Sequence, residues 1–262
     1  MLTHKNLWVI MMNRGIYFYV KFKSLFSAAL SLMFVVSFLY LIMFGIQIDA
    51  GDSVNSSVLQ NNSLPLIIVD PGHGGEDGGT SSADGVNEKD INLAISDKLD
   101  VLLILCGYDT IMTRTEDKLI YDGSPSAMKA KKTADIRNRM AIIESNPESI
   151  FLSIHQNYFT ESKYSGAQVF YSPNDAESQV IAECIQSSIR GKIQNDNERK
   201  IKKSGKEIYL LYHAKTPAVM VECGFMSNYE EARLLGDEEY QIKMSLAIIG
   251  GLNDYFKAKG EW

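Results

Sequence analysis

The sequence IIVDPGHGGEDGG at residues 67–79 runs from an apolar segment directly into a histidine surrounded by glycines. A short, uninterrupted apolar run is typical of a strand that is buried on both faces. Glycines add no packing and cost conformational entropy on folding, so a glycine-rich loop needs another reason to exist. We infer that this loop gives a ligand close access to His73.

Apolar strands alternate with amphipathic helices along the rest of the chain. Strands are expected at 66–70, 108–114, 149–157, 167–172 and 218–224, and helices at 87–107, 133–145, 176–194, from about 227 onward, and at 237–257. Thr133 is expected to cap its helix, and Val180 and Cys184 to face inward. The alternation predicts an α/β fold, a single layered domain at 65–258 with a mostly parallel central sheet flanked by helices.

The N-terminal region has a different character, because its first 48 residues contain no Asp or Glu. Residues 25–48 are uncharged, and as a helix these 24 residues would span about 36 Å, enough to cross a hydrocarbon core of ~30 Å. The basic segment 1–24 should stay in the cytoplasm, so the rest would be exported. We expect one N-terminal membrane helix and a flexible linker at 49–64. A cleaved signal peptide, with secretion to the cell wall, remains the alternative.

The charge balance and the cysteines exclude several classes of protein. Four of the 26 basic residues and two of the 32 acidic residues lie within positions 1–64, so the exported part has a net charge of −8. Such an acidic domain is a poor nucleic-acid binder. Three widely spaced cysteines give neither a disulfide framework nor a CxxC metal site. Cys106 and Cys184 are expected in the core, and Cys223 is expected to pack.

Four polar side chains fall at the same end of the predicted strands. His73 follows the first strand, His155 and Glu222 end two others, and Glu88 opens the first helix from the same edge. Taken singly, they have ordinary explanations: a turn histidine, a core histidine and a carboxylate that complements a helix dipole. Glu222 ends a very apolar strand and must be paired, metal-bound or functional. Together, two histidines and a carboxylate are a suitable ligand set for zinc with an open fourth position.

In their order along the chain, six segments resemble the zinc-dependent N-acetylmuramoyl-L-alanine amidases of bacterial cell walls, the amidase-3 type. The resemblance covers about residues 66–256 and is carried by IIVDPGHGGEDGG, NEKDINL, MTRTED, IRNRMAII, FLSIHQN and PAVMVECGFMSNYEEARLL. It implies Zn²⁺ ligands at His73, Glu88 and His155, and a catalytic acid/base at Glu222. Family members usually have alanine where this chain has Gln156, and many have a basic residue near Tyr212. These departures from the family pattern concern the substrate subsites and not the metal site.

The resemblance implies hydrolysis of the amide between the lactyl group of N-acetylmuramic acid and L-alanine. A membrane anchor joined to a bare catalytic domain is similar to the spore-cortex amidases, which prepare muramic-δ-lactam, and would place the enzyme on the extracytoplasmic side, in the forespore or cortex space. Asn157 is a candidate for substrate contact. Arg139 is a candidate for substrate contact or for supporting the metal ligands, with a surface salt bridge as the alternative. His213 is expected to be a surface or near-site histidine.

Other functions remain open at this stage. A zinc carboxypeptidase or another peptidase could use the same ligands, and a membrane-tethered peptidoglycan-binding protein could keep the fold without turnover. A phosphate-binding loop is disfavoured, because the glycine loop lacks the G-K-[ST] sequence that places lysine on the phosphates. Since the chain has no blocking helix or targeting domain of its own, we also expect a separate membrane-bound activating partner.

Overall fold

The computed structural model describes residues 64–121 and 126–260. The predicted membrane helix at 25–48 and nearly all of the linker lie outside these residues, so both stay predictions. Within the two described ranges, no helix combines the length and the apolar character that a membrane span requires.

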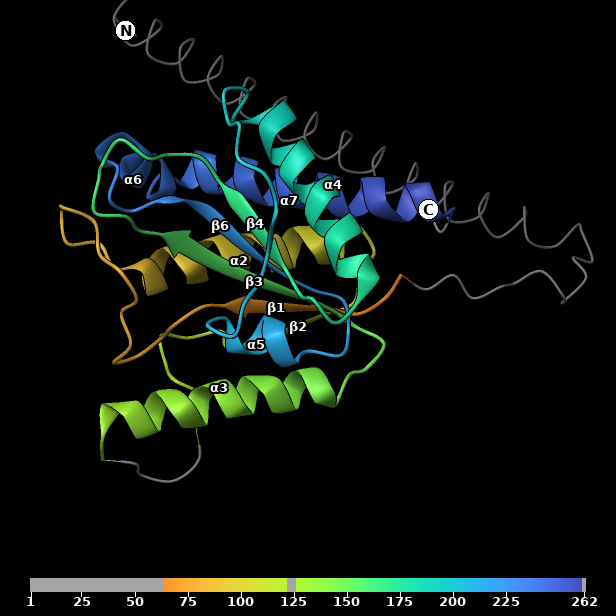
Figure 1. The fold of residues 1–262 in the computed structure, drawn as a ribbon, viewed down its shortest axis with the longest axis horizontal. Helices are drawn as coiled ribbons and strands as arrows, with labels where there is room; N and C mark the ends of the chain where they lie inside the picture. Colours follow the sequence, from red (N-terminus) through yellow and green to blue (C-terminus); the bar gives the residue numbers. More distant parts are fainter. Residues whose placement is uncertain (1–63, 122–125, 261–262) are drawn as a thin grey trace, which may run out of the picture. The chain divides into compact units, whose positions relative to one another are not determined.

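A six-stranded sheet forms the centre of the described domain, in the order β2-β1-β3-β6-β4-β5 (Figure 1). Its strands are β1 (Ile67–Pro71), β2 (Thr110–Met112), β3 (Ile150–Asn157), β4 (Gln168–Tyr171), β5 (Lys202–Lys203) and β6 (Ala218–Phe225). The neighbouring pairs are parallel except β4 with β6, which is antiparallel. The expectation of a mostly parallel central sheet flanked by helices is therefore confirmed.

Helices cover both faces of this sheet (Figure 1). On one face lie α2 (Glu88–Leu105), α4 (Ala176–Lys192) and α7 (Glu238–Lys259), and on the other α3 (Met128–Glu144) and α5 (Tyr209–His213); α6 (Tyr229–Leu235) follows β6. The larger apolar core joins the first group to the sheet, and a smaller one lies under α3 and α5. Both faces of β1, β3 and β6 are thus covered, which explains their continuous apolar sequences.

The inward face of α4 shows why these helices form and stay. Ile181, Ile185 and Ile189 recur every four residues and are fully buried, and each contributes roughly 1.5–3 kcal/mol relative to an exposed side chain. Asp175 caps the helix by accepting a hydrogen bond from the backbone N–H of Glu177, and Arg190 and Lys192 lie in its last turn. Cap, apolar stripe and terminal charges all favour the same helix.

Several local predictions were wrong. Helix α3 begins at Met128, five residues before Thr133, because the lysines and alanines ahead of it favour helix; the Thr133 hydroxyl donates to the Lys129 carbonyl inside the helix. Val180 is 45% exposed, since the buried stripe of α4 is formed by Ile181 and the residues at four-residue intervals after it. Cys106 is exposed because it lies past the last turn of α2, whereas Cys184 packs partly against the core and Cys223 is buried.

Two short elements were not predicted. Strand β5 has only two residues, and both are exposed lysines. Helix α5 has the sequence YLLYH, in which the apolar run is too short for its periodicity to distinguish a helical turn from a strand. Helix α5 matters for function because it lies beside the edge of the sheet that carries the candidate site.

The packing of α7 on α4 generates a test of the fold. A Cβ atom on Gly251 would lie 2.5 Å from the Cα of Ile185 and 2.7 Å from its backbone nitrogen, so the two helices touch through their backbones. We expect Gly251→Ala to lower the free energy of unfolding by about 1–3 kcal/mol, because backbone atoms must move apart. Urea unfolding followed by circular dichroism measures this change.

Gly191→Ala is the matched control. It replaces another helical glycine at a position where an added Cβ meets nothing within 4 Å. There the substitution should leave stability unchanged or raise it by up to about 1 kcal/mol. Equal stability of the two variants would show that the α4–α7 contact is not as close as described.

Candidate active site

The carboxyl ends of β1, β3 and β6 lie side by side, because these neighbouring strands are parallel. The loop after β1 carries His73, while His155 on β3 is the register partner of Glu222 on β6. Glu88 is the first residue of α2 and starts from the same edge. The structure therefore brings together the four side chains that the sequence places at strand and helix ends.

The nitrogen and oxygen donors of three of these residues converge. His73, Glu88 and His155 each offer one atom, and the three atoms lie within 4.8 Å of one another. The Oε1 atom of Glu88 is 3.3 Å from Nε2 of His73 and 2.9 Å from Nδ1 of His155. Zinc bonds of about 2.0–2.2 Å in a tetrahedron place neighbouring ligand atoms roughly 3.3–3.6 Å apart. The donor types therefore fit a zinc ion, and the 2.9 Å and 3.3 Å separations from Glu88 lie within about 0.5 Å of the spacing that zinc requires.

Hydrogen bonds from the surroundings orient two of the candidate ligands, His73 and Glu88. Nδ1 of His73 lies 3.0 Å from Oδ2 of Asp77, so Nε2 remains for a metal. Oε2 of Glu88 accepts from the backbone N–H of Thr80, and Oε1 accepts from that of Gln156. The side chain of Gln156, which departs from the family pattern, donates to Asn92, and Asn92 in turn donates to Glu88. Gln156 thus supports the ligand Glu88.

Two glycine positions leave room for this arrangement. A Cβ on Gly72 would lie 2.1 Å from Nε2 of His155, and a Cβ on Gly79 would lie 2.5 Å from Oε2 of Glu88. Any other residue at either position would displace a candidate ligand. This is the physical reason for glycine at positions 72 and 79.

Two buried arginines hold the loop that carries His73. Arg139 donates to the carbonyls of Pro71 and His73, and Arg114 donates to those of Pro71 and Gly72. His73 has a φ of 60°, a left-handed conformation that is uncommon for residues other than glycine. Because three successive carbonyls are fixed by guanidinium groups, the loop keeps His73 in this conformation and directs its ring toward Glu88.

Each arginine is fully buried, but their ionic partners differ. Arg139 contacts Asp70 at 2.5 Å and Asp135 at 2.8 Å, so a surface salt bridge, the alternative considered for this residue, is wrong. Although burial opposes its charge, Asp70 keeps a pKa below its ordinary value because of Arg139 and hydrogen bonds from Ser153 and Thr113. In the described part of the chain, Arg114 has no carboxylate within 4.0 Å and donates only to backbone carbonyls.

Glu222 differs from the other carboxylates of the site. Its Oε2 atom is buried and has no hydrogen-bond partner among the described residues. Burial raises the pKa of Glu222 to about 7, and Glu88 adds to the effect, while His155 and His73 oppose it. By contrast, Glu88 has a strongly lowered pKa despite its burial, because both histidines pair with it. A carboxyl group with a pKa near neutrality, next to a metal-ligand cluster, is suited to accepting and donating protons.

A cavity of about 330 Å³ opens beside these groups. Its polar side includes His73, His155, Glu222 and Arg139, and its apolar side comes from α5 and the neighbouring strands, namely Ile208, Leu210, Leu211, Met220 and Phe151. Asn157 does not line this cavity, and its side chain accepts a hydrogen bond from the N–H of Tyr158. His213 also lies outside it and stacks on Tyr209, with ring centroids 4.3 Å apart.

Sequence reasoning missed some residues of this site. Arg114 ends the predicted strand 108–114, and a charged residue at the end of a buried strand could have marked it. The apolar wall of α5 left no comparable signal, because YLLYH was not recognised as an element. Asp77 could have been suspected from its position four residues after His73.

Comparisons with known proteins agree with this geometry. The family model described as Amidase_3, N-acetylmuramoyl-L-alanine amidase, matches residues 67–254. The germination-specific N-acetylmuramoyl-L-alanine amidase of Bacillus subtilis is 36% identical over 203 residues, which are 76% of this chain and 84% of that protein. The AmiA amidase of Escherichia coli is 27% identical over 233 residues, covering 73% of this chain and 76% of the relative.

Solved structures give the same result. The CwlD amidase from Clostridioides difficile, determined in complex with the GerS lipoprotein, is 39% identical with a TM-score of 0.71 and covers 74% of this chain and 99% of that one. The AmiC2 amidase of Nostoc punctiforme is 27% identical with a TM-score of 0.62, over 74% and 97% of the two chains. The sheet, the convergent ligand cluster and these matches lead to one conclusion: the chain belongs to the Amidase_3 family of N-acetylmuramoyl-L-alanine amidases.

Proposed function

We propose that this N-acetylmuramoyl-L-alanine amidase is a zinc enzyme that uses Glu222 as its acid/base. It hydrolyses the amide between the lactyl group of N-acetylmuramic acid and the L-alanine of peptidoglycan stem peptides. One observation carries the assignment of residues. Three donor atoms from His73, Glu88 and His155 converge beside a carboxyl group whose buried oxygen has no partner among the described residues.

The chain's own residues have distinct tasks in this reaction. His73, Glu88 and His155 hold the zinc, which when bound supplies a Lewis acid for the amide carbonyl and acidifies water. Asp77 fixes the ring of His73 through Nδ1, and the two arginines fix its backbone. Oε2 of Glu222 takes a proton from the attacking water and gives it to the departing nitrogen of L-alanine. The apolar wall of α5 limits the access of bulk water to this proton transfer.

The cellular role and the partner are proposed from the relatives and from the sequence. The relative in Bacillus subtilis is a germination-specific amidase, which supports a role in the spore cortex and in preparing muramic-δ-lactam. The structure of the CwlD amidase contains a lipoprotein, which supports a membrane-bound partner for this chain as well. The uncharged run at 25–48 supports attachment to the outer side of the cell membrane.

Metal content and reaction products provide the direct test. The purified full chain should contain about one zinc per molecule, a chelator should abolish its activity, and added zinc should restore it. Mass spectrometry of digested sacculi should find peptides that begin with L-alanine and glycan strands that remain intact. Shortened stem peptides still attached to glycan would instead identify a carboxypeptidase, and zinc without any product would identify a binding protein.

Glu222→Gln separates catalysis from metal binding. The amide keeps the shape of the side chain but cannot accept a proton, so we expect kcat to fall by about 10²–10⁴-fold with unchanged zinc content. Glu183→Gln is the control, since it makes the same change at an exposed position on α4. Peptidoglycan cleavage by the Glu222 variant at the wild-type rate would contradict the assignment.

The raised pKa of Glu222 also predicts a pH dependence of stability in the metal-free protein. The folded state favours the protonated carboxyl, whose pKa rises from 4.5 to about 7. Its stabilising contribution is therefore complete below pH 4.5 and is lost as the pH rises through about 7. At about 1.36 kcal/mol per pKa unit, the loss is on the order of 3 kcal/mol.

Comparing the wild type with Glu222→Gln isolates the contribution of Glu222 to the pH dependence of stability. In the presence of a chelator, Glu222→Gln should be more stable than the wild type at pH 8, and the difference should shrink as the pH is lowered to 5. Urea unfolding at several pH values measures it. A difference that is constant with pH would show that Glu222 titrates normally in the folded protein.

A further inference from the structure

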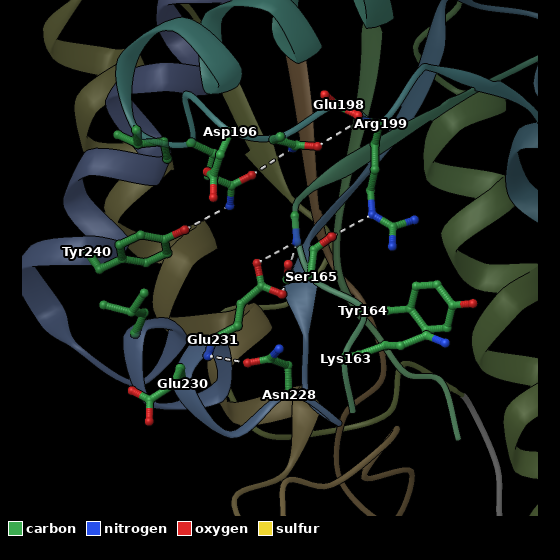
Figure 2. Close-up of a pocket in the computed structure, with 15 residues that line it drawn as sticks. Lys163, Tyr164, Ser165, Asp196, Glu198, Arg199, Asn228, Glu230, Glu231 and Tyr240 are labelled. Atoms are coloured by element: carbon green, nitrogen blue, oxygen red, sulfur yellow. Dashed lines mark hydrogen bonds between the residues drawn. The ribbon is translucent and has the colours of Figure 1, made fainter. Parts of the chain in front are cut away.

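We propose that Arg199 forms a carboxylate-binding subsite beside the catalytic edge, which recognises an acidic residue of the stem peptide. The proposal rests on the amidase function given above and assigns a second contact for the same substrate. Arg199 lies in a groove of about 730 Å³ (Figure 2). This groove shares no lining residue with the catalytic cavity. The groove is bounded by residues 163–166, residues 196–199 and helix α6.

The guanidinium group of Arg199 is held in place on one side. Its Nε atom donates to the carbonyl of Ser165 at 2.7 Å, and its central carbon lies 4.3 Å from the ring centroid of Phe225. A guanidinium stacked on an aromatic ring and fixed through Nε keeps the plane of its remaining N–H groups constant. The side chain therefore pays little further ordering entropy when it binds a ligand.

The other side of this group is open. The two terminal nitrogens have no hydrogen-bond partner among the described residues, and no described carboxylate forms an ion pair with Arg199. Figure 2 shows these nitrogens turned away from Glu198 and Glu231, on the side where Lys163 and Tyr164 lie. Two parallel N–H donors in a fixed plane match the two oxygens of a carboxylate.

The acidic residues of the groove decide what kind of carboxylate can bind. The carboxylate of Glu231 already accepts from the N–H groups of Gly166 and Phe225. Burial raises the pKa of Glu231 and the charge of Arg199 opposes this, but the two groups form no ion pair within 4.0 Å. Asp196, Glu198 and Glu230 are exposed and also line the groove. They disfavour a small free anion, whereas a carboxylate that belongs to an already bound substrate has a high local concentration. The site therefore suits a tethered acid.

The position of Arg199 relative to Glu222 matches the length of a stem peptide. Phe225, over whose ring Arg199 lies, follows Glu222 by three residues in strand β6, and an irregularity in the pairing with β3 falls between them. The Cα atoms of Glu222 and Phe225 are therefore at most about 10 Å apart. An extended peptide covers at most about 3.3–3.6 Å per residue. A substrate whose L-alanine amide lies at Glu222 therefore reaches Arg199 with one of the two residues that follow L-alanine.

Synthetic N-acetylmuramoyl peptides test this assignment on the full chain. One substrate carries free carboxylates on both residues that follow L-alanine, and two others carry a primary amide in place of one or the other. For the wild type, one of the two amidations should raise KM about tenfold to a hundredfold, the range expected for a charged hydrogen-bonded pair, with little change in kcat. The other amidation should have little effect.

The variants identify the residue responsible. Arg199→Gln should raise KM for the acidic substrate by the same factor and should no longer respond to amidation, whereas Arg199→Lys should keep part of the preference. Arg233→Gln is the matched control, because it removes another guanidinium that lies over an aromatic ring, that of Tyr229. It should behave like the wild type. Thermal unfolding checks that all variants are folded.

Three results would overturn the subsite. They are a wild type that does not distinguish acid from amide, an Arg199→Gln variant that keeps the wild-type preference, and a variant that lowers kcat equally on all substrates. Failure of the amidase function itself looks different, since the wild type would then release no peptide from any of the three substrates.

Discussion

The buried ion pair between Arg139 and Asp70 is the interaction on which the site depends. Asp70 is the fourth residue of β1, and Arg139 lies in α3, which covers one face of the sheet. The ion pair therefore joins β1 to this helix. From this fixed point the same guanidinium reaches the carbonyls of Pro71 and His73. Removing Arg139 would leave the buried charge of Asp70 without an ionic partner, which is far more costly than losing a surface pair.

Arg114 shows that stability alone does not explain this arrangement. It is 2% exposed and close to Arg139, yet it binds backbone carbonyls and no carboxylate within the described residues. Burying a second cation beside the first is unfavourable. In return, the two arginines fix the peptide planes of the loop at residues 71–73 before any ligand binds. Preorganisation of this kind supports both metal binding and catalysis.

Much of the fold and of the site could be predicted from the sequence, for identifiable reasons. Buried parallel strands read as apolar runs, and their carboxyl ends meet at one edge, so His155 and Glu222 could be placed together with His73 and Glu88. The amidase-3 resemblance is confirmed by the family match. Arg114 left a signal as a charged residue at the end of a predicted strand, but Arg199 is an ordinary basic residue until tertiary structure shows what it touches. Asn157 remains a prediction for substrate contact.

The reversed direction of β4 has a consequence for how this scaffold can change. Because β4 runs against β6, the long connection from β3 enters β4 at the catalytic edge, and Gln168 pairs with Glu222. Insertions in that connection would change the surface beside the catalytic edge without altering the register of the central strands. Natural diversification, and grafting by protein engineers, should therefore find residues 158–162, which precede the contacts of Ser165 and Gly166, the most permissive place to retune selectivity while the hydrolytic centre is kept.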